Sequence, residues 1–202
     1  MAKMIKFQPK SPRKFGHRRV GSRKRLKLEK FGQLNLFDQS VKEAKVINLP
    51  MNVSPFDEAL LLDEQGDPRA KEAYRLAIKK KDHLADAYCN LGILESTENN
   101  NSQAFNCLTQ SLKHNPRHFE AHYNLANLYS DSGNMALARL HYEIASEIKP
   151  KDANVYYNLG LVLVISKDYQ NAIEALEKYK SLSKSENTDQ ADNLINSLKS
   201  SL

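Results

Sequence analysis

The chain has 202 residues, of which 41% are hydrophobic and 27% are charged, and its mean hydropathy of −0.62 is polar for a compact globule. Its net charge of +6 is unevenly distributed: residues 1–30 carry +11, residues 31–50 are neutral and residues 51–202 carry −5. Two cysteines are too few for a disulfide framework, and no apolar stretch is long enough to span a membrane. These features exclude a disulfide-rich secreted domain and a membrane-spanning protein, and they indicate a cytoplasmic chain.

Residues 1–50 form the first predicted region, a basic and largely disordered arm. Up to residue 30, Lys and Arg alternate with Pro and Gly, so this part buries too little apolar surface to offset its conformational entropy. Its charge density favours contact with the phosphates of DNA or RNA, and the alternative is a solvated tail. No membrane binding is expected, because the arm has no apolar face. The cations expected to contact nucleic acid are Arg13, Lys14, Arg18, Arg19, Arg23, Lys24, Arg25 and Lys27.

An apolar island follows within the arm, at residues 31–37. Here Gln33, Leu34, Leu36 and Phe37 match the Gln-Leu-x-Leu-Phe motif by which bacterial DNA polymerases and mismatch-repair proteins dock on the sliding clamp. This resemblance implies that the last two side chains enter an apolar pocket while the glutamine bonds at its rim. The alternative, which we favour, is that Phe31, Leu34, Leu36 and Phe37 cap the first helical repeat, because solenoids need a cap, or that the island is a general docking peptide.

From residue 51 onward the spacing of apolar residues is helical, and one pattern returns every 34 residues. Ala87-Tyr-Cys-Asn-Leu-Gly92 recurs as Ala121-His-Tyr-Asn-Leu-Ala126 and as Val155-Tyr-Tyr-Asn-Leu-Gly160. Small residues, large apolar residues and a proline follow with the same period. Such a pattern indicates pairs of helices that approach closely at the small side chains.

These motifs resemble those of the tetratricopeptide repeat family. The resemblance implies an all-α solenoid of helix pairs, wound as a right-handed superhelix whose first helices line a concave, peptide-binding groove. We expect four repeats, at residues 51–84, 85–118, 119–152 and 153–186. Apolar residues at helical spacing in 187–202 predict a C-terminal capping helix.

Asparagine occupies one equivalent position in three successive repeats. A side-chain amide carries both a donor and an acceptor, so a ladder of asparagines can hold the backbone of an extended peptide. The alternative is that Asn is simply frequent at this position of the repeat. The residues expected to bind a peptide in the groove are Asn90, Tyr123, Asn124, Asn127, Tyr157 and Asn158.

The same helices indicate which ligand fits. Chaperone-binding members of the family need Lys and Arg at positions that are here Cys89, Tyr123 and Tyr157, with Asp86 and Glu120 nearby. A chaperone's carboxylate tail is therefore not expected. A polar to mildly acidic groove suits a basic or neutral segment, and the chain's own arm meets that description.

Catalytic and cofactor-binding motifs are absent from the sequence, including phosphate-binding loops, nucleophile elbows and Cys-x-x-Cys pairs. His118 and His122 share a predicted helix face, but two ligands are too few for structural zinc. We therefore expect no cofactor, no metal and no enzymatic activity. The sequence predicts an adaptor that binds a protein or peptide in its groove and nucleic acid through its arm. The alternatives are a replication or repair accessory that docks on the sliding clamp and a ribosome- or RNA-associated factor.

Overall fold

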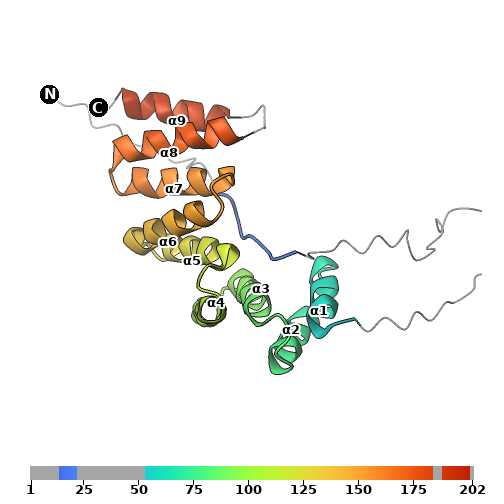
Figure 1. The fold of residues 1–202 in the computed structure, drawn as a ribbon. Coiled ribbons are helices and arrows are strands. Elements are labelled where there is room, and N and C mark those ends of the chain that lie inside the picture. Colours follow the sequence, from blue (N-terminus) through green and yellow to red (C-terminus); the bar gives the residue numbers. More distant parts are fainter. Residues whose placement is uncertain (1–13, 22–52, 184–187, 201–202) are drawn as a thin grey trace, which may run out of the picture.

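The computed structural model describes residues 14–21, 53–183 and 188–200. Within these ranges every regular element is an α-helix, and the helices follow one another along a curved stack (Figure 1). The predicted all-α solenoid is thus confirmed. The helices are α1 (Pro55–Glu64), α2 (Ala70–Lys79), α3 (Leu84–Thr97), α4 (Asn101–His114), α5 (Phe119–Asp131), α6 (Met135–Ile148), α7 (Ala153–Ile165), α8 (Tyr169–Leu182) and α9 (Asp189–Lys199).

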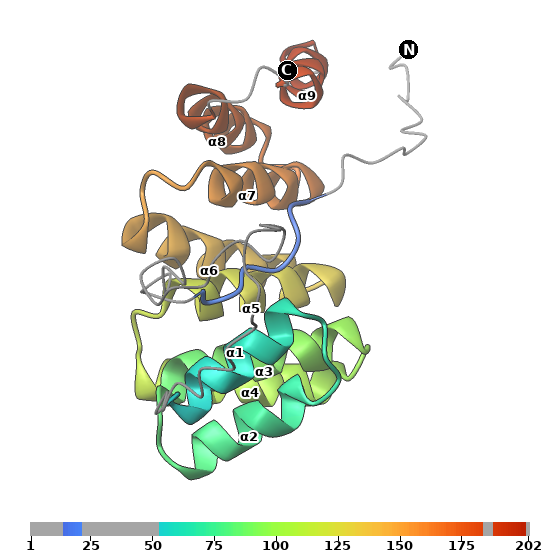
Figure 2. The same ribbon diagram turned by 90° about the vertical axis from the view of Figure 1, so that its right-hand side faces the viewer.

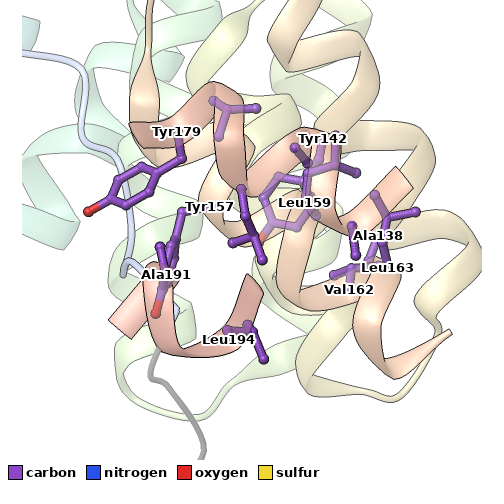
Figure 3. Packing of buried hydrophobic residues seen from close by; sticks show 14 of the residues in the cluster. Ala138, Tyr142, Tyr157, Leu159, Val162, Leu163, Tyr179, Ala191 and Leu194 are labelled. Atoms are coloured by element: carbon purple, nitrogen blue, oxygen red, sulfur yellow. The ribbon is translucent and has the colours of Figure 1, made fainter. Parts of the chain in front are cut away.

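The helices pack as sequential pairs. Each odd-numbered helix from α1 to α7 packs mainly on the helix that follows it, and each pair then packs on the next pair. Helix α9 packs on α8 at the end of the stack. Its side chains Ala191 and Leu194 join the apolar cluster that contains Tyr157, Leu159 and Tyr179 (Figure 3). Helix α9 therefore covers apolar surface that the last pair would otherwise expose. None of these described helices is long and apolar enough to cross a membrane.

The repeated small residue lies where two helices of a pair come closest. A Cβ atom placed on Gly160 would lie 2.8 Å from Cγ of Leu176, and one placed on Gly92 would lie 2.9 Å from Cγ of Leu108. Such distances are too short for carbon atoms, so the side chain of α4 or α8 would have to move. The glycine of the sequence pattern is therefore required by the close approach of α3 to α4 and of α7 to α8.

We expect Gly160→Ala to destabilise the protein by up to about 2 kcal/mol. Overpacking costs about 1–3 kcal/mol of stability. The higher helix propensity of alanine offsets up to about 1 kcal/mol of this cost. Urea unfolding measures the difference. In a Leu176→Ala background the collision is gone, so Gly160→Ala should then stabilise the chain. The same sign of effect in both backgrounds would contradict this account of the packing.

A pair of histidines links α5 to α6. Nε2 of His122 lies 3.0 Å from the backbone oxygen of Pro116, and its Nδ1 lies 2.9 Å from Nδ1 of His141. Since Nε2 must donate to the carbonyl, Nδ1 of neutral His122 accepts a hydrogen bond from His141. Burial lowers the pKa of both imidazoles, that of His141 to about 4. Both rings are therefore neutral at pH 7.

This pair should make stability fall in mild acid. Because the folded state disfavours the charged imidazole of His141, the stabilisation is complete above its unfolded pKa near 6.5 and is lost as the pH falls toward about 4. We expect the free energy of unfolding to drop by up to about 2 kcal/mol more between pH 7 and pH 5 in the wild type than in His141→Gln. Urea titrations of both proteins at the two pH values test this. Parallel losses would show that the pair does not contribute.

Candidate functional site

Residues 14–21, hereafter segment 14–21, lie across the first helices of all four pairs (Figures 1 and 2). The face of α1, α3, α5 and α7 that contacts this segment is hereafter the groove. The segment has no helical or strand structure. Phe15 bonds to α7, Arg18 to α5 and Val20 to α3, so the segment runs opposite to the order of the repeats. Part of the arm that was expected to be largely disordered thus has a single extended path in the groove.

Three asparagines hold the backbone of the segment. In each case the side-chain oxygen accepts a hydrogen bond from a backbone N–H, and the side-chain nitrogen donates one to the C=O of the same residue. An extended peptide has no internal hydrogen bonds, so these amides satisfy groups that would otherwise need water. The pairs, with their N–H···Oδ1 and Nδ2–H···O distances, are Asn158–Phe15 (2.7 and 3.0 Å), Asn124–Arg18 (2.9 and 2.7 Å) and Asn90–Val20 (2.9 and 3.0 Å).

Two of the asparagine amides also donate hydrogen bonds to tyrosine hydroxyls of the helix pairs. Nδ2 of Asn158 also donates to the hydroxyl of Tyr123 at 2.9 Å, and Nδ2 of Asn90 donates to that of Tyr74 at 3.0 Å. Burial raises the pKa of both phenols, so both keep their protons at neutral pH. Tyr123 can then donate to the backbone oxygen of Phe15 at 3.3 Å. The amides of Asn90 and Asn158 are therefore part of a buried polar network that includes the helix pairs as well as the segment.

Asn127, one turn beyond Asn124 on α5, adds a fourth backbone contact. Its Nδ2 donates to the backbone oxygen of Gly16 at 3.3 Å, and its own backbone oxygen accepts from Nζ of Lys14 at 2.8 Å. The same ammonium lies 2.7 Å from Oδ1 of Asp131 at the end of α5. Asn127 thus contacts the segment through both its side chain and its backbone.

Two apolar side chains of the segment enter the protein surface at its two ends. The ring of Phe15 meets that of Tyr157 edge-on at 5.1 Å between centroids and lies 6.1 Å from that of Tyr179. Val20, only 7% exposed, joins the apolar cluster of α1 to α5 that also holds Phe56. Each contact removes apolar surface from water, which stabilises the bound segment.

Carboxylates on α1, at the end of α5 and at the N-cap of α7 pair with the cations of the segment. Besides the pair between Lys14 and Asp131, Nη2 of Arg18 lies 2.7 Å from both oxygens of Asp152, and Arg19 pairs with the buried Asp63. The Arg18 guanidinium also lies over the ring of Tyr123, 5.8 Å from its centroid. Three cations of the arm are therefore matched by three acids of the body.

The residues expected to form the groove all contact segment 14–21: the asparagines bind its backbone, Tyr123 donates to it and Tyr157 packs against its phenylalanine. Sequence reasoning missed the three carboxylates and Tyr179, and placed the acidic character elsewhere. Asp86 instead meets Nε2 of the buried His118 at 2.8 Å, and Glu120 pairs with Lys149 at 2.6 Å. For Asp152 the sequence offered one signal: it directly precedes α7 as the N-cap residue, so it had to lie at a helix end.

Of the eight arm cations expected to contact nucleic acid, Lys14, Arg18 and Arg19 lie in the groove. The others, Arg13, Arg23, Lys24, Arg25 and Lys27, lie outside the described residues, as does the docking motif Gln33, Leu34, Leu36 and Phe37.

Comparisons with known sequences agree with this architecture. Residues 107–139 and 153–186 match families described as "Tetratricopeptide repeat", and residues 126–165 match one described as "TPR repeat". Residues 107–186 are therefore tetratricopeptide repeats, and the solenoid is of the tetratricopeptide type, a class of protein–protein interaction domain.

Among curated proteins, the chain is 34% identical over 113 residues to the human protein O-mannosyl-transferase TMTC3, covering 54% of this chain but only 12% of that protein. Among solved structures, the TPR domain of Sgt2 from Aspergillus fumigatus is 26% identical with a TM-score of 0.52, covering 58% of this chain and 78% of that one. The first TPR of Spaghetti (RPAP3), solved with an HSP90 peptide, is 17% identical with a TM-score of 0.54, covering 58% and 92%.

The ladder predicts where backbone amides exchange slowly with solvent. We expect the amide hydrogens of Phe15, Arg18 and Val20 to be protected, because each is bonded to a buried asparagine. Asn158→Ala should increase the exchange rate of the Phe15 amide more than that of the other two. Asn90→Ala should do the same for the Val20 amide. Hydrogen exchange followed by NMR measures each site separately. Fast exchange at all three amides of the wild-type chain would contradict a segment held in the groove.

Proposed function

We propose that this chain is a non-catalytic protein-interaction module that binds an extended peptide in the groove. The observation that carries the proposal is the pairing of Asn90, Asn124 and Asn158 with both backbone groups of single residues in segment 14–21. Such pairing recognises any extended backbone, whichever chain supplies it. The first TPR of Spaghetti, which binds an HSP90 peptide, gives a precedent for peptide binding by this fold.

The free-energy balance indicates that hydrogen bonds to the backbone do not suffice to hold a peptide in the groove and that side-chain burial has to contribute. The six ladder bonds contribute about 3–9 kcal/mol in total at the usual net value of a protein hydrogen bond. Fixing the backbone of eight residues costs about 8–16 kcal/mol. Burial of Val20 and partial burial of Phe15 add up to about 6 kcal/mol. A bound peptide therefore needs its apolar anchors as well as the ladder.

The lack of a catalytic role is part of the proposal. Burial raises the pKa of the Cys89 thiol well above its ordinary value, so this side chain is a poor nucleophile. The similarity to an O-mannosyl-transferase is confined to the tetratricopeptide region of that enzyme. The groove itself presents amides, phenols and paired carboxylates, which suit binding.

Contact of the arm with nucleic acid, docking of Gln33–Phe37 on a sliding clamp and a cytoplasmic location stay predictions. The structure adds one constraint to the first of these. Lys14, Arg18 and Arg19 already pair with carboxylates, so phosphates would have to compete with the groove for these cations.

Peptide binding can be measured once the groove is free. In the full chain, the triple substitution Phe15→Ala, Arg18→Ala and Val20→Ala removes the side-chain anchors of the segment and defines an open-groove variant. We expect this variant to bind a fluorescent peptide of residues 12–22, followed by anisotropy. Adding Asn124→Ala should weaken binding at least tenfold, because two hydrogen bonds to a buried amide are lost.

Two further substitutions make this test specific. Asn124→Asp keeps the acceptor but loses the donor, so it should also weaken binding. Asn106→Ala, at an exposed position of α4 outside the groove, should leave the affinity unchanged. Circular dichroism checks that every variant keeps its helices. Equal affinity of the Asn124→Ala and Asn106→Ala variants would overturn the proposal.

A further inference from the structure

We infer that the groove selects a partner protein carrying an extended Phe-x-x-Arg-Arg-Val segment, and that segment 14–21 is a built-in competitor for this partner. The inference rests on the proposed function and deepens it, because it assigns a ligand pattern and a means of regulation to the same groove. It depends on the side-chain contacts of the segment, which the backbone ladder does not require.

The groove has separate contacts for the side chains of this pattern. An aromatic side chain at position 15 meets Tyr157 and Tyr179, and an aliphatic one at position 20 enters the α1–α5 cluster. Position 16 is open, because a Cβ atom placed on Gly16 would meet no atom within 4 Å. Selectivity is therefore concentrated at defined positions, with a tolerant one between them.

Arginine suits position 18 better than lysine does. Its guanidinium contacts both oxygens of Asp152 and at the same time lies over the ring of Tyr123. A lysine ammonium is a compact, strongly hydrated charge, so it cannot place one nitrogen against a carboxylate and another part of the same cation over a ring. At position 19, a cation faces Asp63, whose side chain is only 3% exposed and also accepts a hydrogen bond from Tyr74 at 3.1 Å.

The proposed occupant of the groove is a partner protein, and segment 14–21 sets the affinity that this partner has to exceed. Charge complementarity favours a basic ligand, since Asp63, Asp131 and Asp152 face three cations of the segment. The segment belongs to the same molecule as the groove, so a partner competes with an intramolecular contact. A partner therefore binds only when it matches the pattern well enough to displace the segment.

The test compares the wild-type chain with the open-groove variant, using labelled peptides. We expect the peptide of residues 12–22 to bind the open-groove variant at least tenfold more tightly than the wild type. On the open-groove variant, a scrambled peptide of the same composition and one in which Ala replaces the phenylalanine should each bind at least tenfold more weakly. Lysine in place of both arginines should also reduce affinity.

A matched substitution assigns the arginine contact to one carboxylate. Asp152→Asn keeps a side-chain acceptor at the N-cap of α7 but removes the charge. In the open-groove variant carrying Asp152→Asn, the peptide's preference for arginine over alanine at position 18 should shrink at least fivefold. The same substitution should leave the preference for phenylalanine at position 15 unchanged, which separates lost selectivity from a damaged fold.

The outcomes distinguish the inference from the proposed function. Equal binding of scrambled and native peptides would overturn the inference and leave a groove that recognises backbone alone. No binding of any peptide to the open-groove variant would overturn the proposed function. Equal affinity of the wild type and the open-groove variant would show that the segment does not compete. A concentration-dependent dimer in light scattering, lost in the open-groove variant, would replace the partner by a second copy of this chain.

Discussion

An extended backbone carries N–H and C=O groups that no secondary structure satisfies, and segment 14–21 is stable in the groove because side-chain amides satisfy them. The ladder asparagines lie on α3, α5 and α7, one in each repeat, and they meet the segment at Val20, Arg18 and Phe15. The steps along the segment are therefore two and three residues. At about 3.3 Å per residue, these steps span roughly 7–10 Å of extended chain.

The same constraint explains why the floor of the groove is polar and yet buried. Asn90, Asn124 and Asn158 are at most 1% exposed, so each amide needs partners on every side. The segment supplies partners to all three amides, Tyr74 and Tyr123 supply them to Asn90 and Asn158, and the sulfur of Cys89 lies 3.9 Å from Nδ2 of Asn124. A buried network of this kind favours one backbone path, because a shifted segment would leave amide groups unpaired.

The uneven charge of the chain has a structural counterpart in the groove. The acidic body places Asp63, Asp131 and Asp152 along the groove, and the basic arm places three cations against them. Segment 14–21 of the arm is therefore bound to the body through pairs of opposite charges, and the two do not form independent modules.

The 34-residue period, with its small residues and its prolines, determined the helix pairs and the all-α solenoid, since close packing at Gly92 and Gly160 is a local requirement repeated in the sequence. The asparagine positions were equally evident, because they share the period. The carboxylates that meet the arm were not. Asp63 lies in the last turn of α1, Asp131 ends α5 and Asp152 precedes α7, so the three do not share one position of the repeat. Only the stacking of the helix pairs brings them to one face, since residues 44 to 134 positions away from their partners in the arm become neighbours through tertiary packing alone.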